Sequence, residues 1–221
     1  MPQRVYELMS PAYQARIRAF ENNQPPESNN FLQFPVAELK PFIDKTYPTV
    51  SGPEGTAIMG SSMGGHIALY AQGEYPQVFG ASASLSMPWL MASWAKDPAG
   101  TAADRLTVTD GWRTWLKTTR LRPGANRIYS DQGTIGLDRE FTPYMESVTT
   151  MLLNNGWDAG VFQSRVFAGT EHSEKDWRRR VDIPLMFILK RGKMVINMKA
   201  LAFEGKIRLL LPSTGQGGVD G

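Results

Sequence analysis

The chain has 221 residues, of which 42% are hydrophobic and 20% charged, and its formal net charge is +3. This length and composition are typical of one globular domain with a substantial core. With no cysteine and two histidines, disulfides, a thiol nucleophile, thiolate metal sites and an all-imidazole zinc site are excluded, and we expect no cofactor.

The N-terminal part of the chain predicts helices and no strand. Residues 1–30 are polar and rich in Pro and Asn, and they contain one predicted helix at about 12–21. Asn29 or Asn30 is a suitable cap for a second helix. Pro41 is expected to kink that helix, because proline removes a backbone donor. The apolar face of the second helix consists of Phe31, Phe34, Leu39, Phe42 and Ile43.

From residue 56 on, strand-like and helix-like segments alternate. Because parallel strands need crossover helices, this alternation predicts an α/β domain with a mostly parallel sheet flanked by helices. After Leu189 the pattern ends, and 213–218 is typical of disorder. We therefore expect one domain over 1–189 and an atypical, partly disordered tail over 190–221. The predicted strands are the run ending at Gly60, 79–85, 127–130 and 160–167, and the predicted helices are 68–72, 111–118, 143–154 and 174–189.

The most informative motif is Gly60-Ser61-Ser62-Met63-Gly64, which fits the pattern Gly-x-Ser-x-Gly. It stands between a predicted strand and a predicted helix, the context in which a serine is held on a strained turn as an exposed nucleophile. Backbone approaches backbone closely in such a turn, so we expect that neither Gly60 nor Gly64 can carry a Cβ. The motif indicates Ser62 as a nucleophile.

The chain offers two histidines as a base for Ser62. Neutral imidazole is the usual partner of a serine hydroxyl at neutral pH. His172 lies on a predicted loop at the end of a late strand. His66 lies one turn into the helix after the serine, and from there its side chain does not easily swing back over the turn. We interpret His172 as the base and His66 as a structural residue.

The third member of such a site is a carboxylate that lies between the serine and the histidine in chain order. Asp131 and Asp138 are both candidates, in the loop predicted after strand 127–130. Asp131 is so close to the strand that it can instead organise the loop through backbone N–H groups. Asp138 lies further out, before a helical segment, and is preferred. Glu171 is a poor choice, because a residue adjacent to His172 would have to fold back on itself.

Three segments resemble the esterase D and enterochelin-esterase group of α/β-hydrolases. That group also includes feruloyl and acetylxylan esterases, S-formylglutathione hydrolase and the mycolyltransferases. The resemblance extends over about Arg4 to Leu189 and is most specific around the serine and the histidine. The segments are Gly60-Ser61-Ser62-Met63-Gly64-Gly65-His66, Asp131-Gln132-Gly133-Thr134 and Gly169-Thr170-Glu171-His172-Ser173-Glu174.

The resemblance implies that 1–189 is an α/β-hydrolase catalytic domain with Ser62 as nucleophile, His172 as base and an aspartate of the 131–138 loop as acid. Placing Asp138 on the family's acid takes about two extra residues. The complete fold has several strands before its serine turn, and this sequence shows none, so we expect a truncated relative. The backbone N–H of Met63 is one oxyanion donor, whereas the second donor, from a loop after an early strand, has no identifiable source.

The function predicted from these residues is a serine esterase that hydrolyses carboxylic esters through an acyl-enzyme. Two alternatives are a non-catalytic or inactive relative that acts as a binding module, and an acyltransferase that uses the same triad. Trp89, Trp94 and Tyr6 are candidates for lining the substrate pocket, because aromatic surfaces suit acyl or phenolic groups. The ester itself cannot be read from the sequence.

The remaining patterns bear on partners and location. The basic runs 178–180 and 190–193 are short and flanked by apolar residues, which indicates a solvated helix surface rather than nucleic-acid binding. No apolar run reaches about 18 residues and no signal-peptide pattern is visible, so we expect no membrane association and a cytoplasmic location. A sheet without the early strands would expose an edge that favours self-association.

Overall fold

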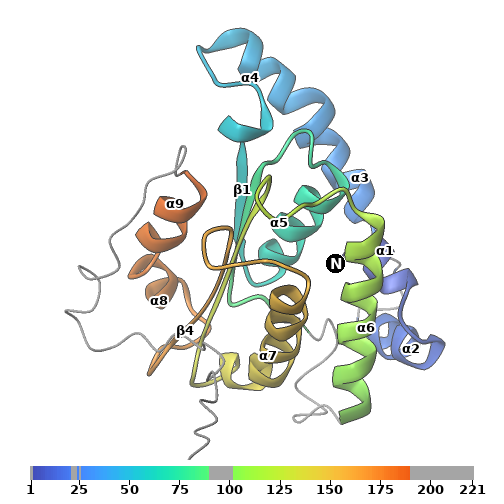
Figure 1. The fold of residues 1–221 in the computed structure, drawn as a ribbon. Coiled ribbons are helices and arrows are strands. Elements are labelled where there is room, and N and C mark those ends of the chain that lie inside the picture. Colours follow the sequence, from blue (N-terminus) through green and yellow to red (C-terminus); the bar gives the residue numbers. More distant parts are fainter. Residues whose placement is uncertain (1, 21–23, 25, 90–101, 190–221) are drawn as a thin grey trace, which may run out of the picture.

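The computed structural model describes residues 2–20, 24, 26–89 and 102–189, and a four-stranded parallel sheet lies at its centre (Figure 1). The strands are in the order β1-β2-β3-β4, so the chain moves across the sheet in one direction. The predicted fold class is confirmed. The strands are β1 (Ala57–Ser61), β2 (Ala81–Leu85), β3 (Arg127–Gly133) and β4 (Phe162–Phe167).

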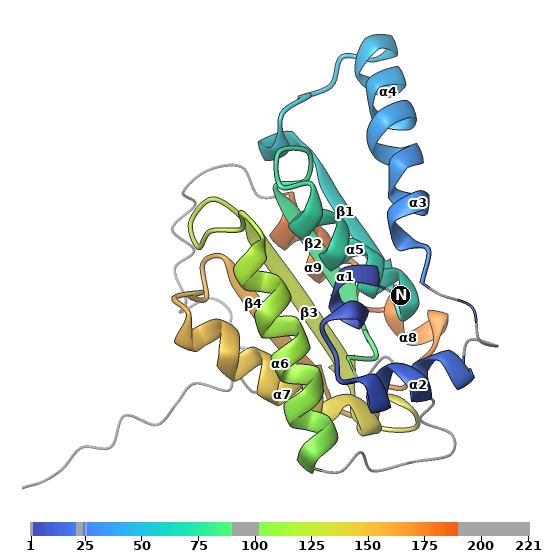
Figure 2. The same ribbon diagram turned by 90° about the vertical axis from the view of Figure 1, so that its right-hand side faces the viewer.

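Helices cover both faces of the sheet, as Figures 1 and 2 show. The larger core contains Tyr70, Trp112 and Trp115, all fully buried. It lies between the sheet and the helices of one face, and the helices of the other face cover a smaller core. The first face carries α5 (Met63–Glu74), α6 (Ala102–Thr118) and α7 (Asp138–Asn154), with α1 (Gln3–Glu7) against α6; the second carries α8 (Glu174–Arg178) and α9 (Asp182–Ile188).

Strand β2 shows how the sequence selects these two faces. Side chains alternate along a strand, and Ala81, Ala83 and Leu85 pack in the smaller core. Between them, the Ser82 hydroxyl donates to Gln72 Oε1 (2.7 Å) and the Ser84 hydroxyl to the Gly65 carbonyl (2.8 Å), both in α5. These small residues are all buried, and their size lets helices approach the centre of the sheet closely.

The N-terminal helices differ in part from the prediction. Helix α2 (Pro11–Phe20) lies close to its expected range. The second predicted helix begins after Glu27 instead of Asn29 or Asn30. Pro41 does not interrupt it, because a wide π-helical turn precedes the proline and the Lys40 N–H donates to the Pro35 carbonyl. The rod (Figure 1) consists of α3 (Ser28–Gln33), η1 (Phe34–Leu39) and α4 (Lys40–Thr46).

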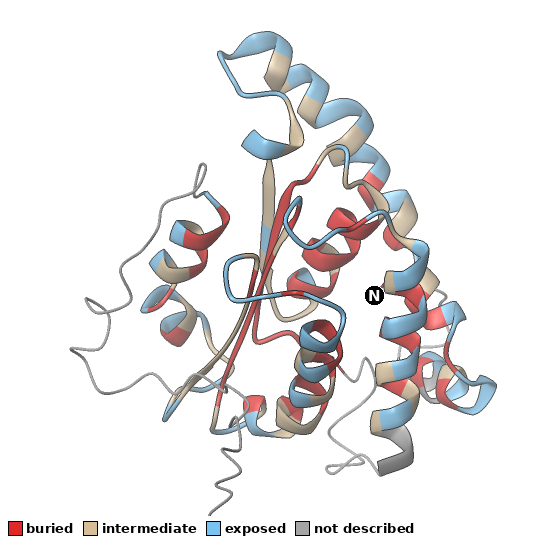
Figure 3. Cartoon of the chain, viewed as in Figure 1, coloured by how far each residue is buried: buried red, intermediate tan, exposed pale blue. Residues whose placement is uncertain are grey.

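The apolar face predicted for this rod is largely exposed, as Figure 3 shows. Phe31, Phe34 and Phe42 are 58%, 54% and 59% exposed. In α3 the buried residues are Ser28 and Leu32. Within the described residues before β1 there is no strand, so β1 forms an edge of the sheet. The rod extends beyond the sheet instead of covering it.

Other elements also begin or end at residues that differ from the predicted ones. Helix α6 begins well before the predicted start at 111, and β3 continues to Gly133, which places Asp131 inside the strand. The single helix predicted over 174–189 is two short helices, α8 and α9. The predicted tail, 190–221, lies outside the described residues. Among the described helices, none has both the length and the apolar character needed to cross a bilayer.

Candidate active site

The carboxyl ends of the four strands meet at one edge of the sheet. Ser62 follows β1, Ser86 follows β2, Asp138 begins the helix after β3 and His172 lies in the loop after β4. The strand register brings the ends of β1, β2 and β3 into one row, because Ser61 pairs with Leu85 and Leu85 with Asp131. In open parallel sheets this edge is where ligands bind.

Ser62 occupies a strained turn between β1 and α5. Its φ is 54° and its ψ −125°, and a positive φ is uncommon for a residue other than glycine. The Ser62 N–H donates to the Leu85 carbonyl (2.8 Å), which ties the turn to β2. Met63 is the first residue of α5, and the Ser62 side chain does not cap that helix. The first amides of a helix lack intrahelical acceptors, so the turn presents a hydroxyl next to an N–H group.

The two glycines of the motif do not have the same steric role. A Cβ at Gly60 would lie 2.4 Å from the Gly64 carbonyl oxygen, which confirms that Gly60 must lack one. A Cβ at Gly64 would meet no heavy atom within 4 Å. The expectation for Gly64 was therefore wrong. The backbone of Gly64 approaches Gly60, but the direction in which a Cβ of Gly64 would point is open.

The structure brings Ser62, His172 and Asp138 together in one chain of hydrogen bonds. His172 Nε2 lies 2.8 Å from Ser62 Oγ, and His172 Nδ1 lies 2.7 Å from Asp138 Oδ1. The rings of Phe141 and Trp177 are nearly perpendicular to the imidazole, at centroid distances of 5.7 and 5.0 Å. With Nδ1–H donating to the carboxylate, Nε2 is free to accept the proton of the serine hydroxyl.

Asp138 is buried and its carboxylate is held on both oxygens. Oδ1 faces His172, and Oδ2 accepts from the Gly133 N–H and the Ser86 hydroxyl, both at 2.6 Å. Burial acts to raise the pKa of Asp138, but the hydrogen bonds from His172, Ser86 and Gly133 outweigh it and hold that pKa below its ordinary value. The group is therefore a carboxylate at neutral pH.

Asp131, the alternative acid, has different partners. Its Oδ1 accepts from Arg180 Nη2 (2.9 Å) and Nε (3.2 Å), and its Oδ2 accepts from the Tyr129 hydroxyl (3.0 Å). Burial raises the pKa of Asp131, and the Arg180 guanidinium opposes that shift. Of the two aspartates, the one that contacts His172 is Asp138.

His66 lies inside the protein. It is fully buried in α5, and its Nε2–H donates to the Pro88 carbonyl (2.8 Å). Burial lowers the pKa of His66 to about 3, so the ring is neutral over the physiological range. These contacts give His66 a packing role.

Two of the three residues suggested for a substrate pocket are buried in the structure. Tyr6 and Trp89 are 6% and 3% exposed and belong to the larger core. Trp89 packs edge-on against Trp112 at 5.2 Å between ring centroids. Trp94 lies outside the described residues. Tyr6 and Trp89 therefore offer little surface to a substrate.

Three residues around Asp138 and Asp131 were not found from the sequence: Ser86, Gly133 and Arg180. Ser86 had one available signal, since it is a polar residue directly after a strand that neighbours the serine strand. Gly133 allows a close approach, because a Cβ there would lie 2.1 Å from the Thr170 carbonyl oxygen. Arg180 belongs to a basic run interpreted as solvated, yet it is only 3% exposed.

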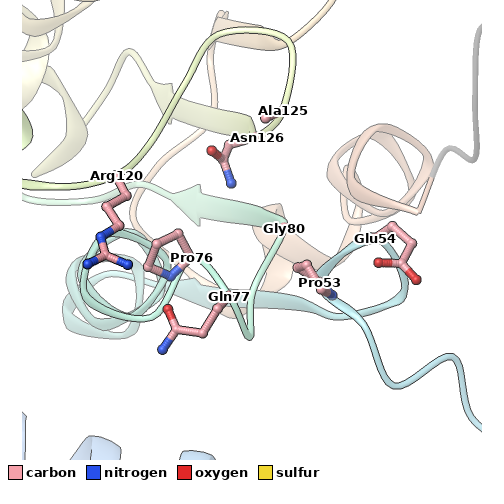
Figure 4. Close-up of a pocket in the computed structure, with 8 residues that line it drawn as sticks. All are labelled: Pro53, Glu54, Pro76, Gln77, Gly80, Arg120, Ala125 and Asn126. Carbon is pink, nitrogen blue, oxygen red and sulfur yellow. The ribbon is translucent and has the colours of Figure 1, made fainter.

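A depression of about 360 Å³ lies at the opposite end of the sheet. Pro53, Gly80 and Asn126, among the residues that line it in Figure 4, precede β1, β2 and β3. The depression is therefore at the amino ends of the strands, whereas Ser62 is at a carboxyl end. It has no part in the hydrogen-bonded site.

Comparisons with known proteins identify the family of the chain. The chain matches the model of the family Esterase ("Putative esterase") over residues 5–182. A search of the curated proteins found no match. The match includes Ser62, Asp138 and His172.

Solved structures with the same fold include two esterases named for enterochelin or enterobactin and one named for ferulic acid. An enterochelin esterase from Shigella flexneri is 18% identical, with a TM-score of 0.53 over 82% of this chain and 40% of that chain. A ferric enterobactin esterase from Salmonella typhimurium is 22% identical, with a TM-score of 0.54 over 79% and 38%. A ferulic acid esterase from Anaeromyces mucronatus is 16% identical, with a TM-score of 0.50 over 72% and 52%. The chain thus spans about two fifths of the length of the first two. The resemblance to the enterochelin-esterase group is confirmed.

Proposed function

The chain belongs to the Esterase family, and on that premise we propose that it hydrolyses carboxylic esters through an acyl-enzyme formed on Ser62. The observation that carries this proposal is the unbroken series of contacts from Ser62 Oγ through the His172 ring to Asp138, at 2.8 and 2.7 Å. A nucleophile, a base and an orienting carboxylate in this geometry suit acyl transfer.

In the first half of the proposed reaction, Ser62 Oγ attacks the ester carbonyl carbon while its proton passes to His172 Nε2. The Asp138 carboxylate keeps Nδ1 protonated, so Nε2 is available as the acceptor, and it stabilises the imidazolium that forms. The imidazolium then gives its proton to the departing alcohol oxygen. The acyl group remains on Ser62 as an ester.

In the second half, water replaces the alcohol. His172 Nε2 takes a proton from the water as its oxygen attacks the acyl carbon, and the proton returns to Ser62 Oγ when the acid product leaves. The negative oxygen of each tetrahedral intermediate is stabilised by the Met63 N–H at the start of α5, where the helix dipole is also favourable.

The test compares two neighbouring serines. Ser62→Ala should abolish both turnover of a short-chain nitrophenyl ester and labelling by a fluorophosphonate, because the alkoxide that would attack is gone. Ser61→Ala is the matched control, since it removes the same atoms one residue earlier, and it should retain labelling. Labelling that survives in Ser62→Ala and is lost in Ser61→Ala would move the nucleophile by one residue. If the unmodified chain neither turns over the ester nor labels, the proposal fails.

A further inference from the structure

Ser86 is a buried serine that the proposed reaction does not itself use. It follows β2 directly, is 0% exposed, and has a φ of +46°. Its N–H donates to the Asp131 carbonyl at 2.8 Å. A residue other than glycine at positive φ costs conformational energy, and such residues collect at functional sites. The strain indicates that the serine side chain has a specific role at this position.

The hydrogen bonds of the Ser86 hydroxyl leave one orientation for its proton. A hydroxyl has one hydrogen to donate and two lone pairs to accept with. Trp177 Nε1 and Arg180 Nη2 lie 2.9 and 3.0 Å from Ser86 Oγ, and both groups can only donate. The two lone pairs are thus filled, and the hydrogen points to Asp138 Oδ2, which lies 2.6 Å away.

One of these two donors, Arg180, is itself held in place. The Arg180 guanidinium bonds to Asp131 and, through Nη1, to Thr170 Oγ1 (3.1 Å), and it lies 4.9 Å from the centre of the Phe167 ring. It is 3% exposed, so solvent offers it no alternative partner. A buried ion pair therefore holds an N–H on the far side of Ser86.

We propose that Ser86 is a positioning residue of the esterase site, which fixes the Asp138 carboxylate so that Oδ1 stays on His172 Nδ1. The inference rests on the proposed function. Asp138 Oδ2 is held by two donors, Gly133 N–H and Ser86 Oγ–H. Without the hydroxyl one donor remains, the carboxylate gains freedom to rotate, and the imidazole is less well oriented for Ser62.

Two variants separate the effect of losing the hydroxyl from the effect of the strained backbone. Ser86→Ala and Ser86→Gly both remove the hydroxyl, but glycine adopts a positive φ without penalty and alanine does not. We expect kcat for the nitrophenyl ester to fall about 10- to 100-fold in both variants, as for the loss of one hydrogen bond to a charged group, with KM nearly unchanged. Their thermal stabilities should differ, with Ser86→Gly the more stable.

Ser82→Ala is the matched control. Ser82 is also a fully buried serine of the same chain segment, and its hydroxyl makes one hydrogen bond, to Gln72. Its loss should reduce stability and leave kcat unchanged. If kcat follows stability across the three variants, or stays at the wild-type value in both Ser86 variants, Ser86 has no positioning role.

A second readout does not depend on turnover. The chain has two histidines, so NMR of a histidine-labelled sample resolves the His172 and His66 rings separately. The His172 Nδ1 proton should exchange with water faster in Ser86→Ala than in the wild type, while the His66 signals stay unchanged. An unchanged His172 proton overturns the inference. A chain with this NMR response but no wild-type ester turnover would instead refute the proposed function.

Discussion

The choice between Asp138 and Asp131 can be tested by replacing each with asparagine, since the structure gives the two residues different partners. In Asp138→Asn, the Gly133 N–H and the Ser86 hydroxyl both point at the position of Oδ2. The amide oxygen will occupy that position, because it alone can accept from them. The amide NH₂ then faces His172 Nδ1 and favours the tautomer with a bare Nδ1, whose Nε2–H cannot take the proton of Ser62.

The expected loss for Asp138→Asn is large. The same exchange in the well-studied Ser-His-Asp template lowers kcat by about 10⁴ through the wrong tautomer, and we expect a loss of that order here. The variant should stay folded, because asparagine has nearly the same shape and keeps two of the acceptor contacts. Stability should change by only about 1–3 kcal/mol, as for an imperfectly satisfied buried polar group.

Asp131→Asn should lower the free energy of unfolding strongly and kcat only slightly. It leaves the buried Arg180 guanidinium without its carboxylate partner, and breaking a buried pair in this way typically costs about 3–5 kcal/mol. His172 keeps its contact with Asp138, so the kcat of the folded fraction should fall far less than in Asp138→Asn.

The assay combines nitrophenyl ester kinetics with urea unfolding of each variant, and kcat is normalised to the folded fraction. The reasoning is refuted if Asp131→Asn loses more kcat than Asp138→Asn while both are folded. It is also refuted if Asp138→Asn retains ordinary turnover, because then no orienting carboxylate is needed at that position.

Three further predictions concern stability and assembly. The pKa of His66 is lowered to about 3 in the folded protein, so between about pH 6.5 and pH 3 this histidine binds a proton in the unfolded state and not in the folded state. The free energy of unfolding should therefore fall as the pH drops through this range. In His66→Gln, urea unfolding should show a smaller fall than in the wild type. Gly60→Ala should lower the free energy of unfolding by about 1–3 kcal/mol. Gly64→Ala should leave it unchanged or raise it by up to about 1 kcal/mol, because the site is open and alanine favours a helix more than glycine does; equal losses would contradict the steric difference. Strand β1 is at a sheet edge and Phe42 is 59% exposed, so we expect the chain to self-associate. Light scattering should detect this association, and Phe42→Glu should reduce it. A monomer at every concentration would contradict this prediction.

The parts of the fold that the sequence predicted are those set by local patterns. The turn at Ser62 is one, because a strand, a glycine-flanked serine and a helix follow one another within a few residues. Chain order then limited the acid and base to few candidates, and Asp138 and His172 are the pair in contact. The same reasoning misjudged Gly64, because a motif does not show which of its two glycines carries the close approach.

The apolar row of the rod shows a second limit of local patterns. The spacing of Phe31, Phe34 and Phe42 predicted a helix with an apolar face, and the segment is helical, but a pattern does not say what covers that face. In the structure it is exposed. Helical periodicity predicts that a segment is a helix. It predicts how the helix is oriented only when the surface that covers its apolar face belongs to the same fold.

The break between α8 and α9 has a local cause, whereas the burial of Arg180 at that break has a cause that no local pattern contains. Pro184, in the first turn of α9, has no N–H to donate to the Arg180 carbonyl, so one continuous helix is interrupted there. At the break, Arg180 turns inward to Asp131, 49 residues earlier in the chain. The same guanidinium bonds to Ser86, 94 residues earlier. A basic residue within a basic run is normally solvated, so only the folded sheet supplies the carboxylate that makes its burial favourable. The surroundings of Asp138 are therefore specified by contacts between β2, β3 and the segment after β4, which are far apart in the sequence.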